Sequence, residues 1–401
     1  MLAILGVLAA FAVIVILRLR NVDFSLSILT GALIIALTSS DPVGVLVEAS
    51  QKTLTDFDTI NLTVAVVLIS VLGCSLKETG TMTELIEGLR GMLPAQVLLA
   101  AIPAMFGLLT IPGGALMSAP FNEPEADRLG LSPEQKTYVN VWFRHLWYWA
   151  SPLSPILITT ASMAGFTLTE YLWAQLPLLA VVLAIGFVVG GTFIRDGGVG
   201  RGSTGGLGSV ARGLTPIVTA IILALVGVPV WLALVPAIAL VFLLKGVQPR
   251  EAVDIAKSGV RWDLAAAAVS MFFFRFVVAS SSSVVALFDA ATSLGIPLFA
   301  ILVVIPLLAG SISGTPTMGL GMILPLLLPL LGEYGVYVVG IIYVGLIAGY
   351  IASPMHLCLI LTNSYYKSEL RKVYRYLVPS AVALYVSAMA YYIFMNGGIP
   401  I

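Results

Sequence analysis

Residues 148–162 read YWASPLSPILITTAS, and residues 350–364 read YIASPMHLCLILTNS. The two stretches share a tyrosine, an Ala-Ser-Pro triplet and several later residues at one constant offset along the chain. Each lies in a long apolar run, and its prolines interrupt a helix because proline lacks an amide proton and clashes with the preceding turn. We therefore expect two spans, at 138–162 and 336–363, that both break near the middle of a membrane.

The composition excludes several classes of protein. Of the 401 residues, 59% are apolar or aromatic and only 10% are Asp, Glu, Lys or Arg, whereas soluble domains carry about 25% charged residues. A soluble enzyme, a nucleic-acid-binding protein and a disordered scaffold are therefore excluded. A backbone in lipid must satisfy its own hydrogen bonds, so the sequence predicts an all-α polytopic membrane protein whose main surroundings are the lipid bilayer.

Apolar runs separated by short polar breaks define the spans. The ten candidates are 2–17, 24–38, 61–76, 138–162, 171–194, 214–227, 229–244, 264–279, 336–363 and 377–395. Two further stretches, 95–120 and 297–331, are interrupted by Gly, Pro, Ser and Thr. We interpret these two as re-entrant hairpins, with one or two ordinary crossings as the alternative, since irregular backbone is tolerated only inside protein or a watery cavity.

Basic residues predict the orientation, because they collect on the cytoplasmic side of the membrane. They group at 18–20, 195–212, 245–261 and 367–375. Ten spans and two hairpins place all four groups inside if the N-terminus starts outside. The acidic segment 41–58 then forms an outer loop. We expect a multi-pass protein of the prokaryotic inner membrane with both termini outside.

A Gly- and Ser-rich stretch at 195–212 predicts a cytoplasmic linker that divides the chain. Residues 1–194 and 213–401 then form two repeats, each with scaffold helices, one hairpin and one broken helix. Five spans precede the linker, so the second repeat enters the membrane upside down. Inverted repeats with interrupted helices are typical of secondary transporters; a structural duplication in another kind of membrane protein is the alternative.

The helix breaks predict a binding site. Ser or Thr followed by Pro favours a new helix start, as at Ser151, Ser154, Thr315 and Ser353. Helix starts carry about half a positive charge and unpaired amides, so several of them aimed at one region attract an anion. Proline kinks in packed helices are the alternative. The candidates for substrate binding are Arg144, Ser151, Ser154, Thr315, Ser353, His356 and Asn363.

Sodium is the expected coupling ion if a cation site exists, because free carbonyls and hydroxyls beside the breaks suit a bare cation. The candidates for this site are Thr110, Gly113, Gly114, Ser311, Ser313 and Thr317. No Asp or Glu occurs from Thr137 to Leu168, and Glu333 is the only one from Ile296 to Tyr366. A cation as the main cargo normally needs a buried carboxylate, so an anion is favoured.

Four titratable or basic residues fall within spans, which makes them functional candidates. His356 either donates to a bound carboxylate or is satisfied by a carbonyl, and Arg144 either contacts substrate or pairs structurally. His145 precedes the first break, and Arg275 could pair with an acid that the sequence does not identify. The two cysteines lie in apolar stretches, where we expect core packing.

Two inverted halves, each with a hairpin followed by a broken span, resemble the ion transporter superfamily, which includes sodium/dicarboxylate, citrate, gluconate and arsenite carriers. The sequence is most similar to a prokaryotic integral membrane family within it, a domain of unknown function. The tip at 313–317, followed by Gly319-Leu320-Gly321, is similar to the superfamily's small-residue tips. The Ser-Asn-Thr tip triplet of the sodium/dicarboxylate carriers is absent, and Thr362-Asn363-Ser364 lies later, past the break.

The resemblance implies a homodimer in which scaffold helices hold the interface and a transport portion moves as an elevator. We therefore expect a secondary active transporter, a symporter of a small organic anion with sodium or protons. An inorganic oxyanion exporter or a passive anion channel of the same fold is the alternative. A membrane-embedded enzyme is more remote, because no suitable catalytic constellation is evident. We expect no catalytic residues, no cofactor, and no metal beyond sodium.

Overall fold

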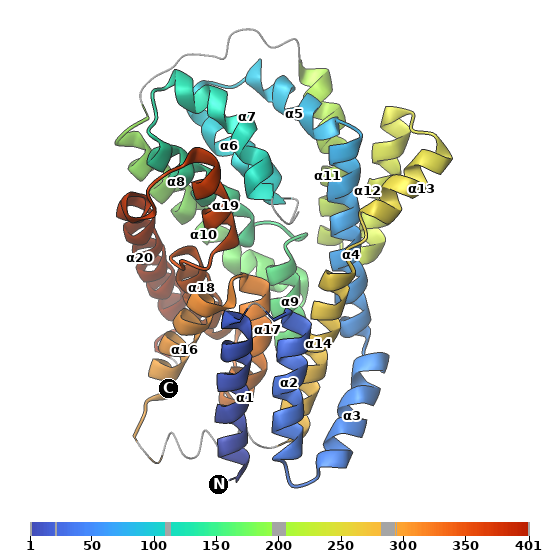
Figure 1. The fold of residues 1–401 in the computed structure, drawn as a ribbon, viewed down its shortest axis with the longest axis vertical. Helices are drawn as coiled ribbons and strands as arrows, with labels where there is room; N and C mark the ends of the chain where they lie inside the picture. The colour runs from blue at the N-terminus through green and yellow to red at the C-terminus, as the bar shows by residue number, and fades with distance from the viewer. Residues whose placement is uncertain are drawn as a thin grey trace.

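The computed structural model describes residues 2–20, 22–108, 114–194, 206–281, 293 and 295–399. Within these residues every regular element is a helix and no strand occurs, so the predicted all-α fold class is confirmed for the described part of the chain. Figure 1 shows the helices gathered into one elongated bundle, with both chain ends in its lower part.

The helices fall into two successions that match in order. The first is α1 (Leu2–Leu19), α2 (Phe24–Leu37), α3 (Pro42–Thr55), α4 (Phe57–Glu78), α5 (Thr81–Arg90), α6 (Ala95–Leu108), α7 (Gly114–Arg128), α8 (Pro133–Arg144), the 3-10 turn η1 (Leu146–Tyr148), α9 (Pro155–Ala164) and α10 (Leu168–Gly191). The second is α11 (Leu207–Leu225), α12 (Val230–Lys245), α13 (Pro249–Ser258), α14 (Trp262–Ser280), α16 (Leu298–Ser313), α17 (Pro316–Leu327), the 3-10 turn η2 (Leu328–Leu330), α18 (Val336–Ile351), α19 (Leu357–Tyr366) and α20 (Leu370–Met395). Each described helix from α11 onward corresponds in position to the helix numbered ten lower.

The apolar helices differ in length. Five are long and apolar enough to cross a membrane: α4, α10, α11, α14 and α20. Shorter apolar helices include α2, α6, α9, α12, α16 and α18. A full crossing of a hydrocarbon core about 30 Å thick takes about 20 helical residues, so the short helices reach only partway unless they tilt or continue through a break. This pattern is that of a membrane-embedded protein.

Side-chain caps fix several of the helix starts. The carboxylates of Asp23, Asp41 and Asp56 accept hydrogen bonds from backbone amides in the first turns of α2, α3 and α4. Ser132 and Gln135 form a reciprocal capping box at the start of α8. Each such cap satisfies amides that have no partner within the helix.

The acidic segment 41–58, expected as an outer loop between spans, is largely helical. Asp41 and Asp56 are N-caps rather than loop residues, and α3 runs between them. This helix buries Val45 and Ala49 and packs against α14. The helix is too short and too polar to be predicted as a membrane span. Its apolar face is covered by α14 in the folded protein.

The predicted linker is also shorter than expected. The stretch 195–212 overlaps α11, which begins at Leu207. Residues 195–205 lie outside the described part of the chain. The start of α11 packs on α5, where Val210 approaches Gly88. Residues 207–212 are therefore helical in spite of Gly208 and Ser209, where this segment packs on α5.

Each of the two stretches predicted as a hairpin forms a pair of adjacent helices. The first, α6–α7, continues to Arg128 instead of ending at residue 120, because Glu125 is buried beside Arg90, whose Nε lies 3.8 Å from its Oε1. The second, α16–α17, turns at Gly314, whose φ of 71° favours glycine. The α6–α7 pair occupies the upper part of Figure 1 and the α16–α17 pair the lower part.

Both predicted helix breaks are confirmed. The first separates α8 from α9, and α9 begins at Pro155 with Ser154 as its N-cap, as the Ser-Pro pattern predicts. The second separates α18 from α19. Here the expected start at Ser353-Pro354 is wrong, because α19 begins at Leu357 and His356 is its N-cap.

The reason for this difference is the hydrogen bonding of Ser353. Its Oγ donates to the carbonyl of Ser311 in α16 at 2.5 Å and accepts from the amide of Met355 at 3.0 Å. The hydroxyl therefore ties the break to the second hairpin instead of capping a helix. A local Ser-Pro pattern does not reveal this partner.

The two halves of the chain interlock at the broken helices. α9 packs on α17, whereas α19 packs on α7 and α8. In the second contact, Asn140 of α8 accepts from the Ser118 hydroxyl at 2.7 Å and donates through Nδ2 to Thr362 Oγ1 at 3.0 Å. Each broken helix therefore ends against the hairpin of the opposite half.

Candidate functional site

A cavity of about 230 Å³ lies between the broken helices and two long helices. The residues that α4 and α14 contribute are all apolar: Leu62, Val66, Leu264, Ala267, Ala268 and Met271. The remaining wall comes from α6, the break after α8, and helices α9, α17, α18 and α19. This second wall carries the polar groups, so the cavity has one apolar and one polar side.

Three helices begin at the cavity. The first residues of α9 line it through Pro155, those of α17 through Pro316, and those of α19 through Leu357. The amides of a first helical turn have no partner within their own helix and carry partial positive charge. The sequence predicted such a convergence, and the structure brings these three starts together.

Arg144 is the last residue of α8 and lines the same cavity with only 6% of its surface exposed. A Cβ atom at Gly114, the first residue of α7, would overlap the guanidinium. A Cβ atom at Gly107 of α6 would overlap the main-chain carbonyl of Arg144. Two glycines of the first hairpin therefore allow it to lie directly on this arginine.

Among the described residues that line the cavity, none is Asp or Glu. The formal charge of Arg144 and the partial charges of the helix starts thus have the same sign. A site of this kind favours a ligand with negative charge.

Thr315 and Thr317, at the start of α17, also line the cavity. Thr315 is the N-cap, and its Oγ1 is buried with no hydrogen-bond partner among the described residues. The Ser154 hydroxyl at the start of α9, beside the cavity-lining Pro155, is likewise buried and has no partner in the part of the chain that the structure describes. Both hydroxyls retain their hydrogen-bonding capacity for a ligand.

Other predicted site residues do not line this cavity. Ser151 accepts from the amide of Leu153 within the first break, at 3.2 Å. Ser311 donates to the Leu307 carbonyl at 2.9 Å, and Ser313 to the Gly310 carbonyl at 3.4 Å. These side chains hold the break or the hairpin in shape.

Asn363 lies near the end of α19 and accepts from the Ser368 hydroxyl at 2.6 Å, whereas the cavity adjoins the start of that helix. Thr110 and Gly113 lie outside the described residues. Gly114 stands beside Arg144, as described above, and Ser353 holds the second hairpin. Of the candidates for substrate binding, Arg144 and Thr315 therefore line the cavity directly.

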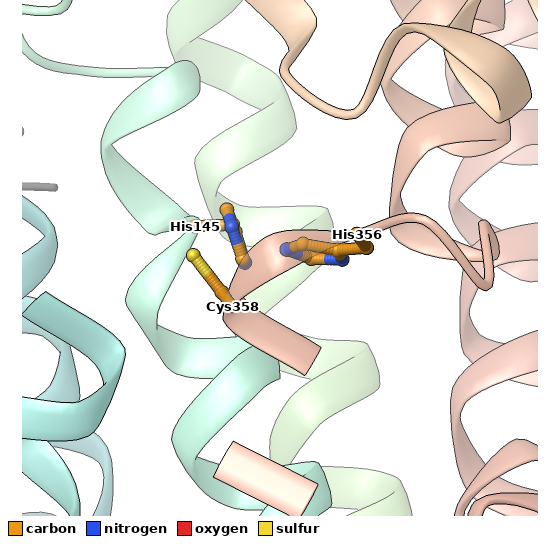
Figure 2. A group of neighbouring side chains, drawn as sticks. All are labelled: His145, His356 and Cys358. Carbon is orange, nitrogen blue, oxygen red and sulfur yellow. The ribbon is translucent and has the colours of Figure 1, made fainter. Parts of the chain in front are cut away.

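His145, His356 and Cys358 form a cluster at the polar wall of the cavity. Figure 2 shows the three side chains together, although they come from opposite halves of the chain. The ring centroids of the histidines are 4.8 Å apart. One ligand atom from each residue can be chosen so that the three lie within 4.8 Å of one another.

Sequence reasoning did not find this cluster. It treated the cysteines as packing residues and the two histidines separately. The only local signal is the His-x-Cys pattern at 356–358. The third residue of the cluster, His145, lies at the break of the other helix.

Arg275 of α14 does not line the cavity. Its guanidinium lies 5.6 Å from the ring centroids of Phe272 and Phe276, and the negative charges that act on it are those of Asp56 and Asp58. These two carboxylates at the start of α4 are candidates for the acid that the sequence left unidentified.

Comparison with known proteins decides the family. Residues 3–394 match the family model described as Protein of unknown function (DUF401). The chain belongs to this family. No curated protein sequence gives a significant match. Among solved structures, the crystal structure of the Alcanivorax borkumensis YdaH transporter superposes with a TM-score of 0.68 at 14% sequence identity.

That superposition covers 96% of this chain and 99% of the YdaH chain. At this level of identity the likeness concerns the fold alone. The chain thus has the overall fold of a membrane transporter over almost its full length, which agrees with its long apolar helices.

Proposed function

We propose that this protein is a secondary active transporter of a small organic anion of the carboxylate type, coupled to sodium or protons, in the inner membrane of a prokaryote. The observation that carries the proposal is the cavity at which Arg144 and three helix starts meet, with no carboxylate among the described lining residues. Free amides at helix starts bind anions, and an arginine binds a carboxylate through two parallel hydrogen bonds.

The volume of the cavity limits the size of the ligand. Sites for drug-sized molecules measure about 300–1,000 Å³, whereas this cavity measures about 230 Å³. A small mono- or dicarboxylate suits the available space, and so does an inorganic oxyanion. The Thr315 and Ser154 hydroxyls would complete the hydrogen bonds to the oxygens of the anion.

The position of the cavity supports an elevator movement. Its apolar wall on α4 and α14 makes non-directional contacts, which a moving body can leave without breaking hydrogen bonds. The polar wall belongs to the hairpins and broken helices, which are tied together by the Ser353–Ser311 and Asn140–Thr362 hydrogen bonds. In this proposal the second group carries the anion past the first.

The repeated order of helices supports two inverted repeats on either side of the linker, and with them termini on the same, outer side. Figure 1 places both chain ends in the lower part of the bundle. A homodimer would hold the α4 and α14 side fixed. Gly114, Ser311, Ser313 and Thr317, with Thr110 and Gly113, would supply oxygens for sodium near the hairpin tips.

Uptake by proteoliposomes tests the proposal. The purified protein is first screened by thermal shift against carboxylates and inorganic oxyanions, each with and without sodium. A radiolabelled form of the anion that stabilises most is then offered under an imposed sodium or proton gradient. Accumulation above the external concentration is expected. Equilibration without accumulation would indicate a channel, and stabilisation by oxyanions alone would indicate the oxyanion exporter.

A further inference from the structure

We infer that His145, His356 and Cys358 form a binding site for a borderline-soft divalent metal ion of the zinc type, which links the two broken helices. Two imidazoles and one thiolate are ligands that zinc prefers, and a fourth position remains for a water molecule or an anion from the cavity. This inference does not depend on the transported substrate.

The hydrogen bonds of the two histidines leave the correct nitrogen atoms available. His145 Nδ1 lies 2.6 Å from the carbonyl oxygen of Val141. A carbonyl oxygen only accepts, so Nδ1 carries the proton and Nε2 presents its lone pair. His356 repeats the arrangement, with Nδ1 3.5 Å from the carbonyl oxygen of Ile351. Metal-binding histidines are commonly oriented in this way by an outer carbonyl.

The Nε2 atom of His356 is the second observation that favours a bound ion. The residue is 0% exposed, and this nitrogen is buried with no hydrogen bond from the described residues. A buried polar atom without a partner destabilises the folded state. A metal ion would satisfy it and would also use His145, whose ring lies beside it.

Distances and access are compatible with zinc. Donor atoms bound to a tetrahedral zinc ion lie about 3.3–3.6 Å apart, and one ring nitrogen of each histidine and the Cys358 Sγ lie within 4.8 Å of one another. Rotation of the side chains that shortens the longest separation between donor atoms by about 1 Å would therefore close the site around the ion. His145 and Cys358 line the cavity, so the ion can enter from there. On binding, Cys358 loses its thiol proton to solvent.

The proposed site would hold two elements that are distant in sequence. His145 follows α8 directly, whereas His356 and Cys358 begin α19. A bound ion would therefore fix the first break relative to the second. The ring of Tyr350 packs against that of His356, with 4.0 Å between the two ring centroids.

Cobalt binding tests the inference, because Co²⁺ takes zinc sites and reports a thiolate ligand by a near-ultraviolet charge-transfer band. The full-length protein is purified in detergent, treated with chelator and reductant, and titrated with Co²⁺. We expect one equivalent per chain with both the charge-transfer and visible d–d bands, and loss of both bands when Zn²⁺ is added. Absence of a thiolate band in the titrated protein would overturn the inference.

The two cysteines give a matched pair of variants. Cys358→Ser should lose the charge-transfer band, while Cys74→Ser should keep it, because Cys74 contacts Ser258 and the Ile255 carbonyl elsewhere. His356→Ala should weaken Co²⁺ binding by more than about tenfold. Size-exclusion profiles and metal-free melting temperatures check folding. A band that persists in Cys358→Ser, or disappears in Cys74→Ser, would contradict the site.

Discussion

Gly107 packs directly against the main-chain carbonyl of Arg144, with no room for a Cβ atom. The same contact recurs in the second half of the chain, where Gly310 packs against the carbonyl of Leu346. In each half, a glycine of the hairpin thus packs on the backbone of the helix that precedes a break. The side chains at the partner positions differ, however, because an arginine in the first half corresponds to a leucine in the second.

Replacing either glycine by alanine tests this close approach. Gly107→Ala and Gly310→Ala should each destabilise the protein by about 1–3 kcal/mol, because backbone atoms cannot move aside for the new methyl group. Thermal unfolding in detergent measures the effect. Gly191→Ala is the control, since nothing lies within 4 Å of its Cβ position. Equal melting temperatures for all three variants would show that the contact is looser than described.

Arg144→Leu removes the cationic side chain while copying the residue at the corresponding place of the second half. We expect the fold to persist and anion uptake to fall by more than about tenfold, the effect of losing about 1.4 kcal/mol of binding. Proteoliposome uptake and the anion-dependent thermal shift measure this. Arg261→Gln is the control, because Arg261 forms an exposed pair with Asp263 at 2.6 Å. Normal uptake by Arg144→Leu would remove the arginine from the site.

Thr315→Ala and Ser353→Ala should both abolish uptake and leave the protein folded. The first removes the unpartnered hydroxyl at the start of α17, and the second releases the Ser311 carbonyl of the second hairpin. Only Thr315→Ala should reduce the thermal shift that the anion gives, because Ser353 does not line the cavity. Thr215→Ala on the exposed side of α11 serves as control. Unchanged uptake in both variants would refute the assignment.

Asn140→Ala and Asn363→Ala should differ in their effect on stability, because the two asparagines have different hydrogen-bond partners. Asn140 is fully buried and joins α7, α8 and α19, so its loss should lower the free energy of unfolding by about 1–3 kcal/mol. Asn363 accepts from Ser368 near the end of α19 and should matter less for stability and for uptake. Loss of uptake in a stable Asn363→Ala protein would restore the role first predicted for this residue.

Much of the architecture was predictable from sequence because its causes are local. A proline in an apolar run interrupts a helix whatever surrounds it, so the breaks before Pro155 and around Pro354 could be located. Ser154 occupies the N-cap position of α9 for an equally local reason, because Pro155 fits the first position of a helix. The all-α fold follows from the need of a backbone in lipid to satisfy its own hydrogen bonds.

Contacts between distant segments decided the rest. Ser353 follows the same Ser-Pro pattern as Ser154, yet its hydroxyl bonds to Ser311 of another helix. His145 meets His356 and Cys358 only because the two broken helices cross at one cavity. Sequence determined that both spans are broken, since a proline interrupts a helix through its own backbone chemistry, whereas tertiary contacts set the residue at which α19 begins. Only tertiary packing decided which groups meet there, since that depends on how helices far apart in the chain lie against one another.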